Sequence, residues 1–245
     1  WASNGESAGT TGFSYRLEAI QIVLVAKGGA APGETVYHFM DAADPCVVYS
    51  AHVQDYGWMP PVQSGAMSGT SGESRRLEAL NMSLVNVNGG IEYSAHVQDY
   101  GWMDWVSGGS IAGTLGQSRR LEAIKIRLTG DAALKYDVYY RIHAQNYGWL
   151  DWAKNGEPAG TAGFSYRVEA VKVVLVPKGD RAPGDTICSF VDKSAPGVVY
   201  STQVQDIGWM ASLCNGAVSG TIGQAKRVEA MRITLANLDG GIESD

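Results

Sequence analysis

The sequence repeats itself, and this repeat limits the available folds more than any other feature. Residues 1–94 align without a gap to residues 152–245, with 52 identical pairs out of 94. A shorter repeat lies inside this 151-residue period, because the motif Arg-[Leu/Val]-Glu-Ala occurs five times. The glutamates of this motif number the modules from one to five: Glu18, Glu78, Glu122, Glu169 and Glu229. Repetition at such periods is typical of arrays in which neighbouring units bury a shared core.

Each module has a common plan of roughly 45 residues. A Gly-Thr-x-Gly turn precedes every Arg-[Leu/Val]-Glu-Ala motif, and four modules begin with a block that runs from Tyr to Gly-Trp. These blocks are residues 49–58, 93–102, 140–149 and 200–209. Successive glutamates are 60, 44, 47 and 60 residues apart, so three modules fill one long period. The two longer intervals carry insertions with Ala-Pro-Gly, at about residues 27–45 and 178–196.

Alternation of apolar and polar residues predicts β-strands. In residues 91–98 the odd positions are apolar and the even ones polar, and in residues 120–128 Ile124, Ile126 and Leu128 share a face. The pair Asn88-Gly89 predicts a hairpin turn with positive φ. Because no segment has a helical period, we expect about four short strands per module and no long helix.

These patterns predict an all-β fold of tandem modules. Because three modules fill the long period, and closure in threes leaves few free strand edges, we expect a pseudo-threefold, β-prism-like arrangement. A β-trefoil or a propeller-like fold are the alternatives. The expected division is a three-module unit at residues 1–135 and a truncated second copy at residues 136–245.

The composite motif resembles a known family. His-Val-Gln-Asp-Tyr-Gly-Trp-Met-Asp-Trp at 96–105, followed by Gly-Thr-x-Gly and by Arg-Leu-Glu-Ala-Ile at 120–124, is similar to the clostridial hydrophobic W repeat. The resemblance covers nearly all of the chain except the insertions. It implies a secreted or cell-surface protein of Clostridia and their relatives, with a loosely defined role in adhesion by binding carbohydrate or protein. It brings no catalytic residues.

Composition excludes several classes of function. A net charge of −6 argues against nucleic acid as a partner, and no apolar run approaches the roughly 20 residues of a membrane span. The three cysteines, Cys46, Cys188 and Cys214, have the spacing of neither a disulfide framework nor a zinc motif. A single disulfide between two of them remains an alternative. We expect no metal and no cofactor.

The chain ends suggest an excerpt from a longer array. The first residue is Trp1, module 1 lacks its opening block, and a sixth module would begin near Ile242. Either the insertion strands near residues 36–39 cover the free edges, or another copy pairs with them, or the protein continues. We expect the last case, with self-association through open strand edges as the alternative.

Two sets of tryptophans have different expected roles. The Gly-Trp residues occur in every complete block: Trp58, Trp102, Trp149 and Trp209. We expect them in the core, and stacking on a sugar ring is the alternative. A second tryptophan is present as Trp1, Trp105 and Trp152 but is replaced in modules 2 and 5. A residue that two modules dispense with is expected at the surface, where it is a candidate ligand contact, and partial packing is the alternative.

Histidine and glutamine also recur on the polar side of the opening strand. His52, His96 and His143 each lie two residues before a glutamine, and module 5 replaces the histidine with Gln203. These residues are candidate ligand contacts, together with Gln54, Gln98 and Gln145. The alternative is a hydrogen-bonded strand histidine. If these positions bind a ligand, module 5 should bind less well.

The recurring glutamate is expected to be structural. In an unbroken strand Glu122 shares the face of Ile124, so its carboxylate needs a buried partner such as Arg120 or backbone N–H groups. No recurring second carboxylate suits a glycosidase, and no hydrolase or phosphate-loop motif occurs.

The sequence therefore predicts a noncatalytic extracellular protein for multivalent recognition, with a glycan favoured over a protein ligand. A structural or self-assembling cell-surface scaffold is the alternative.

Overall fold

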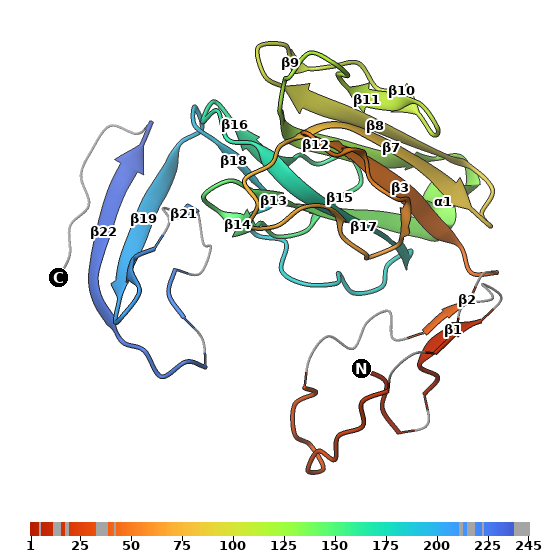
Figure 1. The fold of residues 1–245 in the computed structure, drawn as a ribbon, viewed down its shortest axis with the longest axis horizontal. Coiled ribbons are helices and arrows are strands. Elements are labelled where there is room, and N and C mark those ends of the chain that lie inside the picture. The colour runs from red at the N-terminus through yellow and green to blue at the C-terminus, as the bar shows by residue number, and fades with distance from the viewer. Residues whose placement is uncertain are drawn as a thin grey trace.

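The computed structural model is almost entirely β-structure (Figure 1). Its helix α1 (Asp131–Lys135) has only five residues. Within the described part of the chain no helix has the length and apolar character needed to cross a bilayer. The structure describes residues 1–4, 6–11, 16–17, 20–32, 39–41, 43–210, 213–214, 219–221 and 223–237.

Module 3 (residues 90–130) shows how one repeat folds. Its long strands β8 and β12 pair antiparallel, and the short strands β9 and β10 extend the free side of β8. Its strands are β8 (Gly90–Val97), β9 (Gly101–Trp102), β10 (Val106–Ser107), β11 (Ile111–Gly113) and β12 (Leu121–Thr129). The structure thus has five strands where about four were expected, because the Gly-Thr segment forms a strand of its own.

Modules 2 (residues 46–86) and 4 (residues 136–177) repeat this plan. Module 2 contains β3 (Cys46–Val53), β4 (Gly57–Trp58), β5 (Val62–Gln63), β6 (Ser68–Gly69) and β7 (Leu77–Val85). Module 4 contains β13 (Tyr136–Ala144), β14 (Gly148–Trp149), β15 (Ala153–Lys154), β16 (Ala159–Ala162) and β17 (Val168–Pro177). The turn between β7 and β8 differs from the prediction, because Asn86 and Gly89 take positive φ instead of Asn88 and Gly89.

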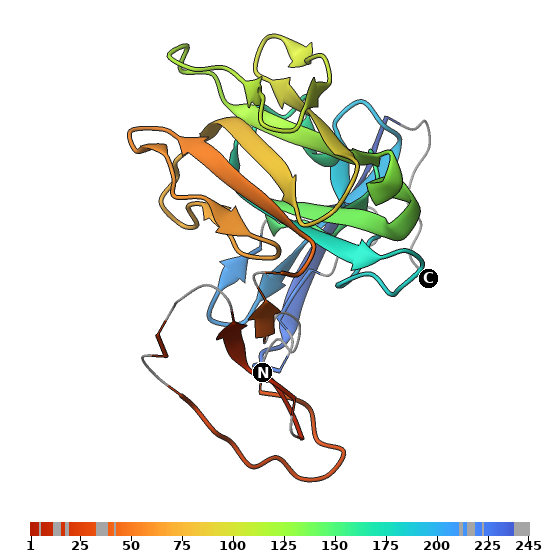
Figure 2. The ribbon, with the colours of Figure 1, turned by 90° about the vertical axis from the view of Figure 1, so that its right-hand side faces the viewer.

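Modules 2, 3 and 4 exchange their Gly-Thr strands in a cycle. Strand β11 of module 3 pairs with β7 of module 2, and β16 of module 4 pairs with β12 of module 3. Strand β6 of module 2 closes the cycle by pairing with β17 of module 4. Figure 2 shows the three long strand pairs around a common interior. The arrangement is the expected pseudo-threefold one, and we call residues 46–177 the three-module unit.

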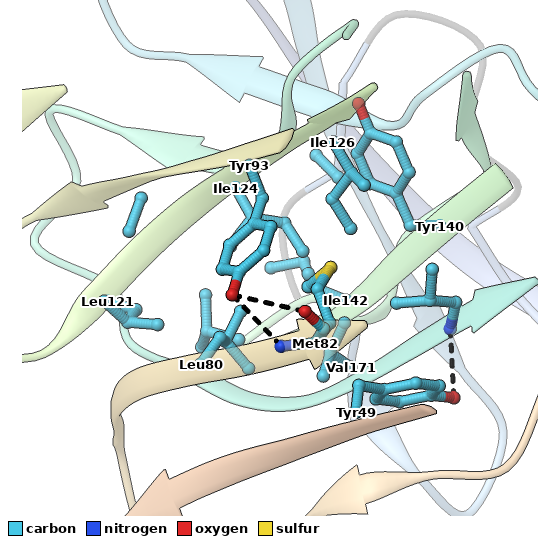
Figure 3. Packing of buried hydrophobic residues seen from close by; sticks show 14 of the residues in the cluster. Tyr49, Leu80, Met82, Tyr93, Leu121, Ile124, Ile126, Tyr140, Ile142 and Val171 are labelled. Atoms are coloured by element: carbon cyan, nitrogen blue, oxygen red, sulfur yellow. Dashed lines mark hydrogen bonds between the residues drawn. The ribbon is translucent and has the colours of Figure 1, made fainter. Parts of the chain in front are cut away.

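One tyrosine per module bridges each junction of this unit (Figure 3). In Figure 3 the hydroxyl of Tyr93 accepts a hydrogen bond from the Met82 N–H (3.1 Å). The same hydroxyl donates to the Ser110 carbonyl. The hydroxyl of Tyr49 accepts in the same way from the N–H of Val173 (3.1 Å). Tyr140 of module 4 hydrogen-bonds to the backbone of Ile126 in module 3, and it donates to the Glu157 carbonyl of its own module. Each tyrosine therefore joins the core to the backbone of a neighbouring module.

The shared core lies between the three sheets and confirms the predicted strand faces. Ile91, Tyr93, Ala95 and Val97 are buried, and so are Ile124, Ile126 and Leu128 on the facing strand. The residues after Glu-Ala in the other two modules, Leu80 and Val171, are buried as well. Alternation along these strands therefore places their apolar side chains in one interior.

Modules 1 (residues 1–26) and 5 (residues 197–237) lie outside the three-module unit (Figure 1). Module 5 has its own sheet, and the described residues of module 1 contain the single strand β1, which pairs parallel with β2 of the first insertion. The strands of this part are β1 (Gly9–Thr11), β2 (Phe39–Asp41), β19 (Gly197–Val204), β20 (Gly208–Trp209), β21 (Leu213–Cys214) and β22 (Val228–Ala236). The expected division between residues 135 and 136 falls inside the three-module unit, at the end of α1.

The second insertion adds a strand to one sheet edge of the three-module unit. Its strand β18 (Phe190–Asp192) pairs parallel with β16, as β2 pairs with β1 in the first insertion. Residues 36–38 lie outside the described residues, and Phe39 starts β2, which pairs with β1 of module 1. Cys46 is a free thiol, Cys188 is buried, and the side chain of Cys214 lies outside the described residues.

Candidate ligand-binding surface

The turn after each opening strand brings the Gly-Trp tryptophan back beside the histidine. In module 3 the turn has positive φ at Asp99 and Gly101, and β9 then pairs with the end of β8 so that Trp102 faces His96. The two rings meet edge to face, with centroids 5.3 Å apart and planes at 82°. The equivalent pairs, at 5.4 and 5.5 Å, are His52–Trp58 and His143–Trp149.

The other side of each histidine contacts the recurring glutamate. His96 Nδ1 lies 3.2 Å from Glu122 Oε2, and Arg120 Nη2 lies 2.8 Å from Oε1. The same distances for the histidines of modules 2 and 4 are 3.2 and 3.1 Å. A tryptophan, a histidine, a glutamate and an arginine thus form one connected row in each of modules 2, 3 and 4.

Hydrogen bonds favour the ionised form of the Glu122 carboxylate in this row. Burial raises the pKa of Glu122, but hydrogen bonds from His96 and Arg120 outweigh it, and the net pKa lies below the ordinary glutamate value. Glu78, Glu122 and Glu169 are buried, as predicted, whereas Glu229 is exposed and Glu18 lies outside the described residues. Because both oxygens face cationic or hydrogen-bonding partners, these carboxylates are structural acceptors.

The predicted face of the glutamate is wrong, and a β-bulge is the reason. The pairing of β12 with β8 shifts between Leu121 and Ala123, so that Leu121 lies opposite Val97 and Ala123 opposite His96. The extra residue breaks the two-residue alternation. Glu122 therefore leaves the apolar face and lies beside His96, and the same shift occurs in modules 2, 4 and 5.

The Gly-Trp tryptophans are not core residues, contrary to the prediction. Trp58 is 40% exposed and Trp209 44%, while Trp102 and Trp149 are half-buried. In modules 2, 3 and 4 the tryptophan packs against the histidine of the His-Glu pair, on the polar side of the opening strand. The large interior aromatic residue of these three modules is instead the tyrosine of the opening strand.

Cations cover most of these indole rings. Lys125 Nζ lies 4.1 Å from the Trp102 ring centroid, and Arg232 lies 4.6 Å from that of Trp209. In module 4 both Arg141 and Lys172 lie over Trp149. The covering position follows Glu-Ala by two residues, and this recurrence of Lys or Arg is the sequence signal that could have revealed it.

Module 2 lacks the covering cation. Asn81 replaces the lysine there, and its amide donates to the carbonyls of Gly109 (2.6 Å) and Ser110 (3.1 Å). Within the described part of the chain no cation lies over the Trp58 ring. Trp58 is therefore the most open indole face among the Gly-Trp residues of the three-module unit.

The second set of tryptophans divides. Trp105 is 37% exposed, as expected, and lies 4.2 Å below Arg127, which pairs with Glu92. Trp152 contradicts the expectation of exposure, since it is only 6% exposed. The backbone N–H of Trp152 donates to the carbonyl of Asp185 in the second insertion, and Gly184 of the same insertion packs against the indole ring. Trp1 is half-buried in module 1.

The glutamines lie at the mouth of the same turn and act there through their backbone. The N–H of Gln98 donates to the Arg120 carbonyl (3.0 Å), and the Gln98 carbonyl accepts from Arg119 (3.3 Å). Gln54 and Gln145 donate to the equivalent carbonyls. All three side chains are half-buried. The structure therefore brings the glutamines close to the turn that carries the tryptophan.

An arginine beside this turn was missed by the sequence analysis. Arg119 contacts Asp99 and stacks on Tyr100, with its guanidinium carbon 4.6 Å from the ring centroid. Arg75 makes the equivalent contacts with Tyr56 and Asp55 in module 2. Among the described residues no group of three His, Cys, Asp or Glu side chains could hold a metal ion.

Comparison with protein families agrees with this repeat structure. The family model described as "Clostridial hydrophobic W" matches residues 1–26, 52–86, 96–130, 143–177 and 203–237, which is more than half of the chain. No curated protein and no solved structure matches the chain. The five matches each contain one Glu-Ala motif, and the four complete ones begin at the histidine position of the Trp-His-Glu row. The chain belongs to the clostridial hydrophobic W repeat family.

Proposed function

We propose that this chain is a noncatalytic extracellular module for multivalent recognition and that its ligand is a glycan. The observation that carries the proposal is the half-exposed indole of Trp58, over which no cation lies among the described residues. A flat indole face suits the C–H groups of a sugar ring. The carboxylates nearby are paired with Arg and His, so they supply no free acid for catalysis.

His52 supplies a polar group beside this indole. Its Nδ1 lies 3.2 Å from Glu78 Oε2, which leaves Nε2 as the nitrogen that can meet a ligand hydroxyl. The ring is edge-on to Trp58 at 5.4 Å, so a sugar on the indole would lie within reach of the histidine. An aromatic surface with a few placed polar groups is the usual composition of a small-ligand site.

The repeat supplies several such surfaces on one rigid unit. Trp58, Trp102 and Trp149 lie on three different sheets, and Trp105 adds a second indole to module 3. Because Lys125 and Lys172 cover two of the Gly-Trp rings, single sites should differ in affinity. Several weak sites on one frame raise the overall affinity for a polymer through effective concentration.

Titration of the full chain with cellohexaose and maltohexaose tests the proposal. These uncharged oligosaccharides differ in linkage, and tryptophan fluorescence with calorimetry reports binding. The Trp58→Ala variant should lose the larger share of binding, and Trp102→Ala, in which a cation covers the ring, is the matched control. The Lys125→Asn variant should gain affinity, because it gives module 3 the side chain found in module 2.

A glycan array with the same protein covers other sugars. Binding of any array glycan that weakens in Trp58→Ala supports the proposal. If no sugar binds on the array or in solution, the glycan proposal fails and a protein ligand becomes the better candidate.

A self-assembling scaffold is the second candidate function, because strand edges and apolar side chains are exposed in modules 1 and 5. Its test is the oligomeric state of the chain, which does not depend on any glycan.

A further inference from the structure

Among the described residues, modules 1 and 5 each expose one half of the kind of junction that joins modules inside the three-module unit. Inside the three-module unit every long Glu-Ala strand carries a Gly-Thr strand on its outer edge, as β12 carries β16. Strand β22 of module 5 pairs only with β19 in the described part of the chain. Strand β1 of module 1 pairs only with β2 there. An edge strand with unpaired N–H and C=O groups is a template for another strand.

The glycines of the Gly-Thr strands show what is missing. A Cβ on Gly160 would lie 2.5 Å from the Glu122 carbonyl oxygen and 2.6 Å from the Ala123 Cα, because β16 packs against that backbone. Gly69 and Gly113 are equally crowded by the Glu-Ala of their neighbouring modules. Gly9 has the same positive φ, but no described atom lies within 4 Å of its Cβ position. Gly9 therefore has the backbone conformation that packs against a Glu-Ala strand elsewhere, but no described Glu-Ala strand lies beside it.

The apolar side chains of module 1 show the same vacancy. Leu17, Ile20 and Ile22 are 75–81% exposed. The 151-residue period matches them to Val168, Val171 and Val173, which are completely buried. Module 1 thus displays a core face that a complete unit buries.

Module 5 displays the complementary face. Met231 is 64% exposed and Ile233 40%, whereas their counterparts in module 3, Ile124 and Ile126, are buried in the shared core. In module 3 that face packs against module 4, which also supplies β16 to the edge of β12. Module 5 therefore exposes the Glu-Ala strand edge of a junction, which we call the outgoing half. Module 1 exposes the Gly-Thr strand of a junction, which we call the incoming half.

We propose that module 1 of one copy docks on module 5 of a second copy, with β1 paired antiparallel along the free edge of β22. The register of β12 with β16 places Gly9 opposite Ala230 of the other copy. The resulting strand order, β19-β22-β1-β2, repeats the order β8-β12-β16-β18 inside the three-module unit. The exposed Leu17, Ile20 and Ile22 then cover Met231 and Ile233.

A second copy is the occupant that the chain itself supplies. Residues 1–94 are a near copy of residues 152–245, so β1 and β2 closely match β16 and β18 in sequence. The two halves lie on different parts of the molecule (Figure 1). Such a head-to-tail contact builds open chains of molecules unless the rotation between copies closes a ring.

Sedimentation of the full chain over a wide range of concentrations tests this interface. The wild-type mass should rise with concentration and pass beyond that of a dimer. Gly9→Ala should block the incoming half, because its Cβ would meet the backbone of Glu229 and Ala230. Gly28→Ala is the matched control, since Gly28 also has positive φ and open space around it.

Met231→Lys should block the outgoing half. Met231 is exposed in the single copy, so the change should not disturb its fold, and Leu134→Lys on the exposed side of α1 is the matched control. Each blocked variant alone should stay monomeric. An equimolar mixture of Gly9→Ala and Met231→Lys retains one competent half of each kind, and it should form dimers and nothing larger.

Several results would overturn the proposal. A wild-type chain that stays monomeric, or one that stops at a symmetric dimer, contradicts a head-to-tail junction. Assembly of Gly9→Ala at the wild-type concentration, or a mixture that forms no dimer, contradicts the assigned strands. Glycan binding plays no part in these readouts, so failure here leaves the glycan proposal intact.

Discussion

Replacement of Tyr93 by phenylalanine tests the tyrosine bridge between modules 2 and 3. The hydroxyl accepts from the Met82 N–H at 3.1 Å and donates to the Ser110 carbonyl, and the side chain is fully buried. Burial raises the pKa of Tyr93, so the hydroxyl keeps its proton and can donate throughout the neutral range. The variant removes one oxygen atom and keeps the ring, so the packing of the core should persist.

The magnitude follows from the two partners. The Ser110 carbonyl still accepts from Asn81, so its lost hydrogen bond should cost about 1 kcal/mol. The buried Met82 N–H loses the partner that the tyrosine supplied, and an orphaned donor of this kind costs about 1–3 kcal/mol. We expect Tyr93→Phe to lower the free energy of unfolding by about 2–4 kcal/mol in total.

Urea unfolding followed by tryptophan fluorescence measures this loss, since Trp102 and Trp105 lie in the same module. Tyr100→Phe is the matched control, because its hydroxyl is exposed and bonds only to Gln117 among the contacts described (3.0 Å). That variant should change stability by less than about 0.5 kcal/mol. Equal effects of the two substitutions would refute the bridge as a stabilising contact.

Three further variants test other parts of the account. Gly113→Ala should lower the free energy of unfolding by at least about 3 kcal/mol in thermal unfolding, because φ is +109° and the new Cβ would clash with the Glu78 carbonyl oxygen. Gly116 also has positive φ but lies in open space, so Gly116→Ala should cost about 1 kcal/mol. Glu122→Gln should cost about 1–3 kcal/mol at neutral pH in urea unfolding. Because the pKa of Glu122 is lowered on folding, its contribution is present above the ordinary glutamate pKa and is lost as the pH falls through the folded value, so the variant should show a weaker loss of stability in acid than the wild type. Ile126→Ala should cost about 2–5 kcal/mol and Trp58→Ala clearly less, and the reverse order would return the Gly-Trp residue to the core.

The fold was largely predictable because the repeat carries it. The 151-residue period contains three modules, and the alternation around Tyr93 and Ile124 assigns the buried face of each strand. The boundary of the unit was harder to predict, because counting modules from Trp1 groups modules 1 to 3. The structure instead groups the modules that lie between the two insertions, since only these have short connections that allow the strands to be exchanged.

The candidate site was predicted less well, and the errors have physical causes. Recurrence of Trp58 and its equivalents suggested the core, but in modules 2, 3 and 4 the recurring tryptophan packs against a recurring histidine at the surface. The bulge beside Glu122 changes a two-residue alternation by one position, and strand patterns do not reveal such a shift. Burial of Trp152 depends on the second insertion, which folds over it from more than 30 residues away.

The contact between Tyr49 and Val173 tests the closed three-module unit most directly. The two residues are 124 positions apart, and the Val173 N–H donates to the Tyr49 hydroxyl at 3.1 Å only if module 2 meets module 4. A nuclear Overhauser measurement on the full chain should show a cross-peak between the Tyr49 ring protons and the Val173 amide proton. Absence of that cross-peak, with the cross-peaks between β3 and β7 still present, would mean that the modules fold individually without closing in threes.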